Sequence, residues 1–435
     1  MRCHPNGKNV GCPAMSAAGN LMGAEFYSQY QAVRDQSVNI CEPLEIEDYL
    51  IQPMEDASPP KWHLAHVTWF FETFLLKPFS PRYKVFSEPF EVLFNSYYNG
   101  VGPQHPRGLR GTLSRPTVQQ VLDYRAHVDH HMAILLNENM SEQASIRTTL
   151  GIHHEQQHQE LLFTDIKYNL GNNPLHPCYH NTLTREKKSL MEMTFSEFAG
   201  GIYEIGNNLI EDFAFDNESP RHEVLVSDFC LANRLVTNAE YMEFVNDDGY
   251  NRPELWLSDA WSMLSKLGEN RWQAPLYWHI GEDGVDEYTL SGLSPIISEE
   301  PVCHVSAYEA DAYARWKGYR LPTEIEWEIS AQDQAVSGNF SDSEQYHPVP
   351  AHKARLDSLF GNLWEWTSSS YAPYPGFTPF EGQLGEYNGK FMANQLVLRG
   401  GSCVTPPGHI RASYRNFFYP PDRWQFSGIR LVSDG

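Results

Sequence analysis

Two histidines with the spacing of metal ligands, His154 and His158, occur within residues 151–162. On a helix this spacing places both imidazoles on one face, one turn apart, so both can reach a single metal ion. Neutral imidazole is a ligand for zinc, iron, copper and nickel. Two ligands do not complete a site, so the sequence predicts a third ligand on another element.

His66 is the leading candidate for the third ligand, because it lies on a predicted helix over residues 61–76 that must pack in the same bundle. His63, three residues earlier on that helix, is the alternative. A metal site made of two histidines and one carboxylate is not excluded, and Glu155 or Glu160 would then be the carboxylate ligand.

A second histidine pair, His127 and His131, has the same spacing. Periodicity does not distinguish between the two pairs. The first pair is favoured because Gln157 and Glu160 lie on nearby faces of its helix, where they could support the metal-binding imidazoles by hydrogen bonds.

Four helices are predicted to position these residues. Apolar residues recur at helical intervals in each of them, and the run Ser58-Pro59-Pro60 is typical of a helix start. The predicted helices span residues 25–50, 61–76, 117–137 and 141–170. They predict a four-helix bundle, a fold that builds metal sites from facing helices.

A long connection without periodicity, residues 78–116, joins the second and third helices. Loops of this length are usually functional or disordered, and the aromatic residues here argue against disorder. Tyr97 and Tyr98 could place a phenol near the metal, where it would donate a proton or a hydrogen bond. Three arginines of the loop could bind a substrate carboxylate through paired hydrogen bonds: Arg107, Arg110 and Arg115.

The chain divides into two predicted domains. Residues 1–24 are rich in Gly, Asn, Ala and Ser and are predicted to be disordered, and residues 171–190 are predicted to be a linker. Beyond the linker, in residues 191–435, short strands alternate with turns, and a helical pattern is confined to residues 320–329. The prediction is an α+β protein with a helical bundle over residues 25–170 and a mixed, loop-rich second domain.

Composition narrows the class of protein. With 435 residues and 41% hydrophobic residues, the chain can bury two cores. The net charge of −23 argues against nucleic acid and anionic membranes as partners. No run approaches the roughly 18 apolar residues of a membrane span, and the first residues lack an apolar signal core, which predicts a cytoplasmic protein. The seven cysteines are scattered without a Cys-x-x-Cys pair, which indicates reduced thiols.

The second half resembles the formylglycine-generating-enzyme/sulfatase-modifying fold, which is C-type-lectin-like. The motifs that carry this resemblance follow in order at residues 200–206, 218–222, 236–241, 320–327, 361–367, 398–402 and 428–432. The first half resembles the DinB-like metal-binding helical bundle, through residues 62–66 and the pair His154/His158.

The two halves together resemble the ergothioneine-biosynthesis sulfoxide synthases (the EgtB family). Three stretches support this resemblance: residues 41–53, 58–66 and 154–160. It implies a mononuclear non-haem Fe(II) enzyme that uses O2. The reaction joins the sulfur of a cysteine-type thiol to the imidazole C2 of hercynine (Nα-trimethylhistidine) and oxidises that sulfur.

The resemblance also implies roles for particular residues. The iron ligands would be His66, His154 and His158. Gln157 would hydrogen-bond the hercynine imidazole, and the carboxylate and cationic head of hercynine would contact Asn416 and Phe417. An aromatic face attracts a quaternary ammonium by about 0.5–2 kcal/mol. Tyr387 matches a further substrate contact, and Arg107 or Arg110 would anchor the thiol substrate.

The chain departs from its relatives at four positions. The cysteine pair of the formylglycine-generating enzymes is replaced by Thr405 and Ile410, which argues against copper or thiol chemistry there. The catalytic tyrosine that some synthases carry in the second domain is replaced by Leu384, so Tyr97 and Tyr98 are predicted to supply the phenol. Phe418 stands where γ-glutamylcysteine-using relatives have an acidic residue, which favours free cysteine as the thiol substrate.

Three alternatives stay open. An ovothiol-type synthase would join cysteine to a different imidazole carbon of histidine, although those proteins usually carry an additional methyltransferase domain. A zinc-dependent DinB-type thiol transferase would need no O2. A binding module without catalysis would need neither iron nor His154.

Overall fold

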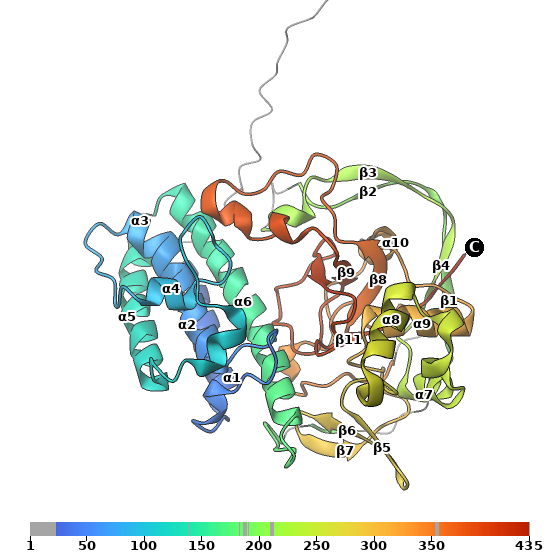
Figure 1. The fold of residues 1–435 in the computed structure, drawn as a ribbon. Helices are drawn as coiled ribbons and strands as arrows, with labels where there is room; N and C mark the ends of the chain where they lie inside the picture. Colours follow the sequence, from blue (N-terminus) through green and yellow to red (C-terminus); the bar gives the residue numbers. More distant parts are fainter. Residues whose placement is uncertain are drawn as a thin grey trace, which may run out of the picture.

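The computed structural model describes residues 23–138, 140–181, 183–185, 189, 191–208, 213–352 and 356–434. A helical bundle stands beside a larger mixed domain (Figure 1), which confirms the predicted α+β architecture. Most of the segment predicted to be disordered, residues 1–22, lies outside the described residues. Among the described residues no helix has the length and apolarity of a membrane span.

Four long helices form the bundle, as predicted. The helix α2 packs against α5 and α6, and α1 packs against the same two helices. Their bounds are α1 (Gly23–Cys41), α2 (Pro60–Phe71), α5 (Val118–Asn137) and α6 (Glu142–Gly171). One π-helical turn (Glu72–Leu76) continues α2 into α3 (Lys77–Phe79), and the long loop contains the short helix α4 (Phe90–Phe94) and a 3-10 turn (Arg107–Thr112).

Local signals explain where these helices begin. Pro60 occupies the first position of α2, where a missing N–H costs nothing. Thr117 and Gln120 form a reciprocal capping box at the start of α5, and the Ser141 hydroxyl accepts a hydrogen bond from the backbone N–H of Ala144 in α6.

The prediction for the first helix was wrong at its end. The helix α1 ends at Cys41, not near residue 50, and only a 3-10 turn (Asp48–Leu50) follows. Pro43 explains the early stop, because proline lacks the N–H of a helical hydrogen bond and disfavours helical geometry in the residue before it.

A buried charge cluster holds the bundle together. Glu155 on α6 is fully buried and accepts hydrogen bonds from Arg34 of α1 at 2.9 Å, from Ser37 of α1 at 2.6 Å and from Arg125 of α5 at 2.5 Å. Removing one partner of a buried ion pair typically costs about 3–5 kcal/mol. Glu155 is therefore committed to the bundle core, and the prediction that it could be a metal ligand was wrong.

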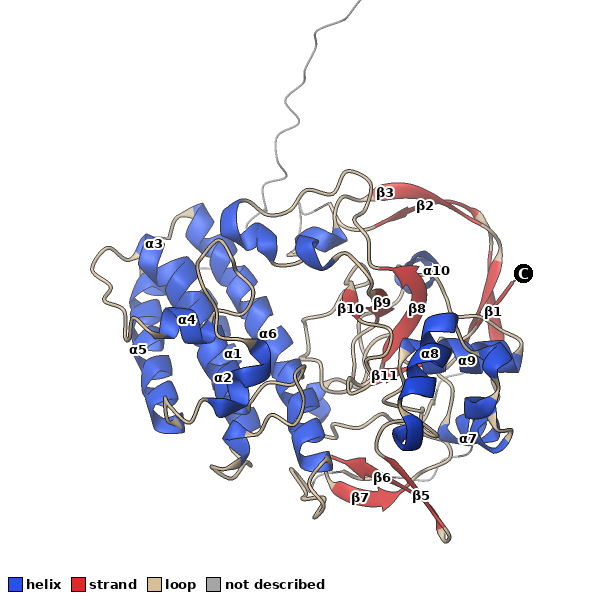
Figure 2. Ribbon diagram, viewed as in Figure 1, coloured by secondary structure: helices blue, strands red, loops and turns tan. Residues whose placement is uncertain are grey.

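Four small sheets and four helices form the second domain (Figure 2). The strand order of the central sheet is β10-β9-β8-β11. Its strands are β8 (Trp364–Ser370), β9 (Leu396–Arg399), β10 (Asn416–Phe418) and β11 (Ser427–Gly428). The other sheets comprise β1 (Phe195–Phe198), β4 (Phe229–Ala232) and β12 (Val432–Asp434); the ribbon β2 (Gly201–Ile205) and β3 (His222–Val226); and β5 (Trp278–Gly281), β6 (Gly284–Thr289) and β7 (Gly292–Pro295).

This domain contains more helix than the sequence pattern predicted. Its helices are α7 (Asn238–Asn246), α8 (Ser258–Lys266), α9 (Ala307–Lys317) and α10 (Glu324–Ala331). The single predicted helix, residues 320–329, corresponds to α10, which begins four residues later because Thr323 and Glu326 form its capping box. The other helices are short, which explains why their periodicity was weak in the sequence.

Charged residues of the sequence motifs pair with one another in the core of this domain. Glu365 forms a fully buried ion pair with Arg430 at 2.7 Å. Glu324 forms buried ion pairs with Arg399 at 2.8 Å and with Arg415 at 2.9 Å. These motifs therefore specify the fold of the domain, since each charge has a partner from a distant motif.

The helix α6 is the bundle helix that faces the second domain (Figure 1). Glu160 on α6 accepts hydrogen bonds from the hydroxyls of Ser402 at 2.9 Å and Thr405 at 2.7 Å, and from the Trp364 indole. The idea that Glu160 supports a metal-binding histidine was therefore wrong. The hydrogen bonds of Glu160 with Ser402 and Thr405 join the two domains instead.

Candidate functional site

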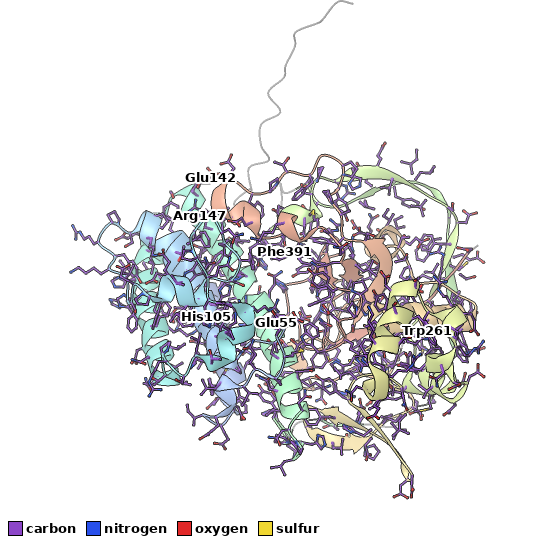
Figure 3. All side chains as sticks on the ribbon, in the orientation of Figure 1. Glu55, His105, Glu142, Arg147, Trp261 and Phe391 are labelled. Carbon is purple, nitrogen blue, oxygen red and sulfur yellow. The ribbon has the colours of Figure 1, made fainter. Side chains whose placement is uncertain are left out.

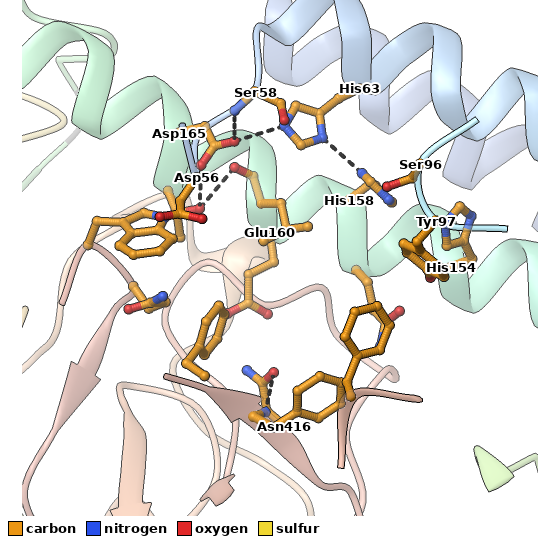
Figure 4. Close-up of a pocket in the computed structure, with 18 of the residues that line it drawn as sticks. Asp56, Ser58, His63, Ser96, Tyr97, His154, His158, Glu160, Asp165 and Asn416 are labelled. Atoms are coloured by element: carbon orange, nitrogen blue, oxygen red, sulfur yellow. Dashed lines mark hydrogen bonds and ion pairs between the residues drawn. The ribbon is translucent and has the colours of Figure 1, made fainter. Parts of the chain in front are cut away.

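A pocket of about 400 Å³ lies between the bundle and the second domain (Figure 4). The bundle side contributes residues of α2, α6 and the long loop, and the opposite side is formed by β10 and the segment around residue 387. The pocket is lined by twelve residues that the sequence or its resemblance singled out: His63, Tyr97, Arg107, Arg110, His154, Gln157, His158, Glu160, Tyr387, Asn416, Phe417 and Phe418.

Three histidines meet at the bundle side of this pocket. Ligand nitrogens of His66, His154 and His158 all lie within 4.8 Å of one another. His66 and His154 are 0% and 2% exposed. Nε2 of His66 and both ring nitrogens of His154 have no hydrogen-bond partner. Unpaired buried nitrogens are costly, so their convergence on one point is the arrangement expected of metal ligands.

Hydrogen bonds behind two of these imidazoles fix which nitrogen faces the cluster. Nδ1 of His66 donates to the backbone carbonyl of Phe94 at 2.6 Å. Nδ1 of His158 lies 2.8 Å from Nδ1 of His63 (Figure 4). In both residues Nε2 is thereby left for a metal ion.

His63 is the middle of a relay rather than a member of the cluster. Its Nε2 lies 2.9 Å from Oδ2 of Asp165, and the same carboxylate oxygen accepts from the backbone N–H of Ser58 at 2.8 Å. The alternative of His63 as the third ligand is therefore not favoured by this geometry. A carboxylate linked to a ligand through an imidazole orients that ligand and raises its basicity.

The environment keeps the three clustered imidazoles neutral. Burial lowers the pKa of His66, His154 and His158 well below the usual histidine range, and the neighbouring imidazoles lower it further. Metal ions bind the neutral form of imidazole. Three neutral imidazoles with inward nitrogens therefore fit a divalent transition metal and leave coordination positions free on the pocket side.

The two loop tyrosines occupy different places. Tyr97 borders the pocket, whereas Tyr98 is fully buried behind it. Their rings stack at 4.7 Å, and Tyr98 also contacts the rings of Trp69 at 5.6 Å and Phe74 at 5.0 Å. Burial raises the pKa of both phenols above the ordinary tyrosine value, so both are protonated at neutral pH.

The second domain holds the tyrosine loop in place. The Glu386 carboxylate accepts from the backbone N–H groups of Asn99 at 3.0 Å and Gly100 at 2.7 Å. Lys390 donates to the backbone carbonyl of Tyr97. Phe391, which lies between the two domains (Figure 3), packs its ring against Tyr97 at 5.1 Å. The position of the phenol thus depends on both domains.

Two of the three loop arginines reach the pocket. Arg110 is 5% exposed, lies 3.4 Å from the centre of the Trp62 ring, and donates to the hydroxyls of Ser58 at 2.9 Å and Ser96 at 3.2 Å. Its Nε has no partner. No carboxylate of the described residues forms an ion pair with it, which leaves a buried cation for an anionic ligand.

Arg107 lies at the exposed rim of the pocket, where it donates to the backbone carbonyl of Asp56. Arg115 donates to the backbone carbonyl of Ser114 and does not line the pocket. The sequence did not separate these arginines; their burial does.

Gln157 of α6 links the histidine side of the pocket to two tyrosines of the second domain. Gln157 accepts a hydrogen bond from the hydroxyl of Tyr387 and donates one to the hydroxyl of Tyr414 at 2.7 Å. The Tyr387 ring lies 5.7 Å from that of His154. On β10 the Phe417 ring stacks on Tyr371 at 4.0 Å. The position of the missing tyrosine, Leu384, is buried and does not border the pocket.

Two other groupings of ligating residues have different surroundings. His127 and His131 pack beside Tyr83 on the outside of the bundle, and among the described residues they do not belong to any group of three ligating atoms within 4.8 Å of one another. Glu287, Glu300 and His347 also lie within 4.8 Å of one another. The guanidinium of Arg185 donates to both of these carboxylates, so a cation already occupies that cluster.

Sequence reasoning missed Asp165 and Tyr414. Asp165 lies seven residues after His158, which is two helical turns along the same face of α6, and this spacing was an available signal. Tyr414 lies two residues before Asn416, and alternation along an extended chain places the two on one face.

Comparisons with known proteins agree with this arrangement. Residues 29–162 match the DinB superfamily, and residues 180–358 and 355–435 match the sulfatase-modifying factor enzyme 1-like domain. The chain is 30% identical over 281 residues to the formylglycine-generating enzyme of Streptomyces coelicolor, covering 54% of this chain and 87% of that protein.

Two relatives match nearly the whole chain. The hercynine oxygenase of Mycolicibacterium smegmatis is 32% identical over 406 residues, which cover 87% of this chain and 91% of that protein. The hercynine oxygenase of Mycolicibacterium thermoresistibile is 31% identical over 405 residues, which cover 87% of each chain. With both domains matched and the histidine cluster between them, the chain belongs to the hercynine oxygenase family.

Proposed function

We propose that this protein is a non-haem Fe(II)- and O2-dependent sulfoxide synthase of ergothioneine biosynthesis. It joins the sulfur of L-cysteine, or of γ-glutamylcysteine, to the imidazole C2 of hercynine and oxidises that sulfur. The observation that carries the proposal is the cluster of His66, His154 and His158 at the edge of a pocket between two domains, in which nitrogens of His66 and His154 are buried without a partner.

The reaction balances without an external reductant. One atom of O2 ends on the sulfur. The other leaves as water with the thiol proton and the proton from imidazole C2. The two substrates therefore supply all the electrons that O2 accepts.

The three histidines would hold the iron. Iron held there would supply the redox chemistry for the reduction of O2. The protein keeps the imidazoles neutral by burial, and the relay through His63 and Asp165 fixes the ring of His158.

Hercynine fits between Gln157 of α6 and the β10 side of the pocket. Gln157 offers a hydrogen-bonding amide beside His158, and Asn416 lies on β10 with its side chain at the pocket. Phe417 borders the same pocket and presents an aromatic face. Such a face suits the trimethylammonium head, since a desolvated cation–π contact contributes about 2 kcal/mol.

The thiol substrate fits beside Arg110. This buried cation has no ion-pair partner among the described residues, so it suits the cysteine carboxylate, and Arg107 lies at the rim as a second cation. Phe418 borders the pocket without a charge. In γ-glutamylcysteine the ammonium lies on the glutamyl group, which would reach this region, so the uncharged side chain favours free cysteine.

Tyr97 would act as the proton donor. Its phenol borders the pocket and is protonated at neutral pH, and Tyr98 supports it from behind. Tyr387 is the second phenol at the pocket and would contact hercynine through its partner Gln157.

Oxygen uptake by the anaerobically iron-loaded protein tests the proposal. Hercynine and cysteine are added separately and then together, and products are identified by mass. Uptake that requires both substrates and yields their coupled sulfoxide is expected. Histidine replacing hercynine as the better substrate would indicate the ovothiol-type reaction, and thiol transfer without O2 by the zinc-loaded protein would indicate a DinB-type transferase.

A further inference from the structure

A chain of hydrogen bonds runs from the pocket into the junction between the domains. It begins at Tyr387, whose hydroxyl donates to Oε1 of Gln157. Nε2 of Gln157 donates to the hydroxyl oxygen of Tyr414 at 2.7 Å. That hydroxyl lies 3.1 Å from Nε2 of His409, a residue that is 1% exposed and does not line the pocket.

His409 sets the direction of this chain. Its Nδ1 lies 3.3 Å from Oε1 of Gln156, an atom that only accepts hydrogen bonds, and 3.1 Å from Nδ1 of His153. Donation from Nδ1 to Oε1 of Gln156 places the proton of the neutral ring on Nδ1 and leaves Nε2 as an acceptor. Burial and the nearby charge of Arg411 lower the pKa of His409 well below the usual histidine range, which keeps the ring neutral.

The hydroxyl of Tyr414 therefore donates its single proton to Nε2 of His409. Its oxygen is left to accept a hydrogen bond from the amide of Gln157. A tyrosine hydroxyl has one donor and an amide side chain has two distinct ends. Once Tyr414 accepts from the NH2 end, the carbonyl end of Gln157 must face Tyr387 and the pocket.

We infer that His409 is a positioning residue that fixes the amide of Gln157 through Tyr414, so that a hydrogen-bond acceptor faces the bound imidazole. The inference rests on the proposed function, in which the imidazole belongs to hercynine. An acceptor at this place selects the ring N–H of the substrate. Without the hydrogen bond to Tyr414, the amide of Gln157 can turn its NH2 end toward the pocket. That end is a hydrogen-bond donor and cannot pair with the N–H of the substrate imidazole, which is also a donor.

The affinity of the iron-loaded protein for hercynine, measured by calorimetry without O2 or thiol, tests this inference. Tyr414→Phe removes one oxygen atom and is expected to weaken hercynine binding about five- to tenfold, as expected for one lost hydrogen bond. His409→Leu removes the acceptor behind it and is expected to do the same. His409→Gln keeps an acceptor within reach of Tyr414 and is expected to restore most of the affinity.

The double variant separates positioning from general damage to the fold. If His409 acts through Tyr414, His409→Leu has no further effect in the Tyr414→Phe background, because coupled residues are not additive. Iron content and cysteine affinity should be unchanged in every variant. Additive losses, equal losses for the Leu and Gln variants, or unchanged affinity in Tyr414→Phe would overturn the inference.

Folding of each variant is checked by its thermal midpoint. Tyr414→Phe decides the question if the His409 variants do not fold, since it alters no packing volume. A wild-type protein that does not bind hercynine would refute the proposed function, and the inference with it. A wild-type protein that binds hercynine while Tyr414→Phe binds it equally well would refute the inference alone.

Discussion

Among the described residues, two clusters of ligating side chains lie inside this protein, and they differ in whether their polar atoms have partners. His66, His154 and His158 leave nitrogens unpaired at the edge of a pocket. Glu287, Glu300 and His347 are equally close together. Their carboxylates, however, already bind the guanidinium of Arg185, and Nε2 of His347 lies 3.0 Å from Glu300.

The difference shows that closeness of ligating residues is a weak criterion for a metal site. The clusters differ in whether their buried polar atoms have hydrogen-bond or ion-pair partners. In the second cluster the opposite charges are satisfied by one another, so a cation there would compete with Arg185. In the first cluster the buried nitrogens have no partner, and burying them unpaired is unfavourable unless a ligand arrives.

The largest effect is expected from removing a histidine of the first cluster. His154→Ala should abolish stoichiometric iron binding and reduce O2 uptake with both substrates to background. The matched variant His347→Ala should keep its iron, because that residue binds Glu300 rather than a metal. Metal analysis after gel filtration and an oxygen electrode measure both quantities. Equal loss of iron in both variants would contradict the claim that the first cluster, and not the second, binds iron.

Removing the guanidinium of Arg185 should allow the second cluster to bind a metal ion, as the first cluster is expected to do. Arg185→Ala leaves two buried carboxylates without a cation, so the free energy of unfolding should fall by about 3–5 kcal/mol. A divalent cation such as Mn²⁺ should then raise the thermal midpoint of the variant but not of the wild type. Denaturant titration and thermal unfolding test this, and a variant as stable as the wild type would show that Arg185 does not fill the cluster.

Tyr97 borders the same pocket as the first cluster. Tyr97→Phe, alone or combined with Tyr98→Phe, should reduce sulfoxide formation about a hundredfold, the lower range for losing a general acid. Iron and hercynine binding should be spared, since neither tyrosine contacts the unpaired nitrogens. Tyr98→Phe alone should have a smaller effect, because its ring lies behind Tyr97. Unchanged turnover in the double variant would remove both tyrosines from the mechanism.

A smaller effect is expected behind the first cluster. Asp165→Asn weakens the hydrogen bond to His63 and should lower iron affinity about 10- to 100-fold, the range found for residues that support metal ligands. Asp129→Asn is the matched control, because Asp129 pairs with Arg34 at 2.7 Å in the bundle and should affect stability only. Competition with a chelator measures the affinity; equal affinities for the two variants would contradict a role for the relay.

Much of this site could be predicted from the sequence, because its histidines lie in short segments with clear helical spacing. The spacing of His154 and His158 and the helical run around His66 placed a third histidine on a facing helix, and the family resemblance favoured His66 over His63. The fold of the second domain could be anticipated only by resemblance, since its order depends on buried ion pairs such as Glu365 with Arg430 that join distant motifs. No periodicity reveals such pairs.

Other features depended on tertiary structure alone. The roles of Glu155 and Glu160 were misjudged because a helix pattern gives the face of a residue but not its partner, and both carboxylates have partners from other elements. For the same reason the sequence did not distinguish buried Arg110 from exposed Arg107. The link from His409 to Gln157 crosses the domain junction and has no signature in either half.

The most direct test of the central claim is an anomalous difference map from crystals of the protein loaded anaerobically with iron, collected on both sides of the iron absorption edge. The account predicts one strong iron peak within bonding distance of Nε2 of His66, a nitrogen of His154 and Nε2 of His158, and no peak at Glu287, Glu300 and His347. Iron at the second cluster, or none at the first, would contradict it.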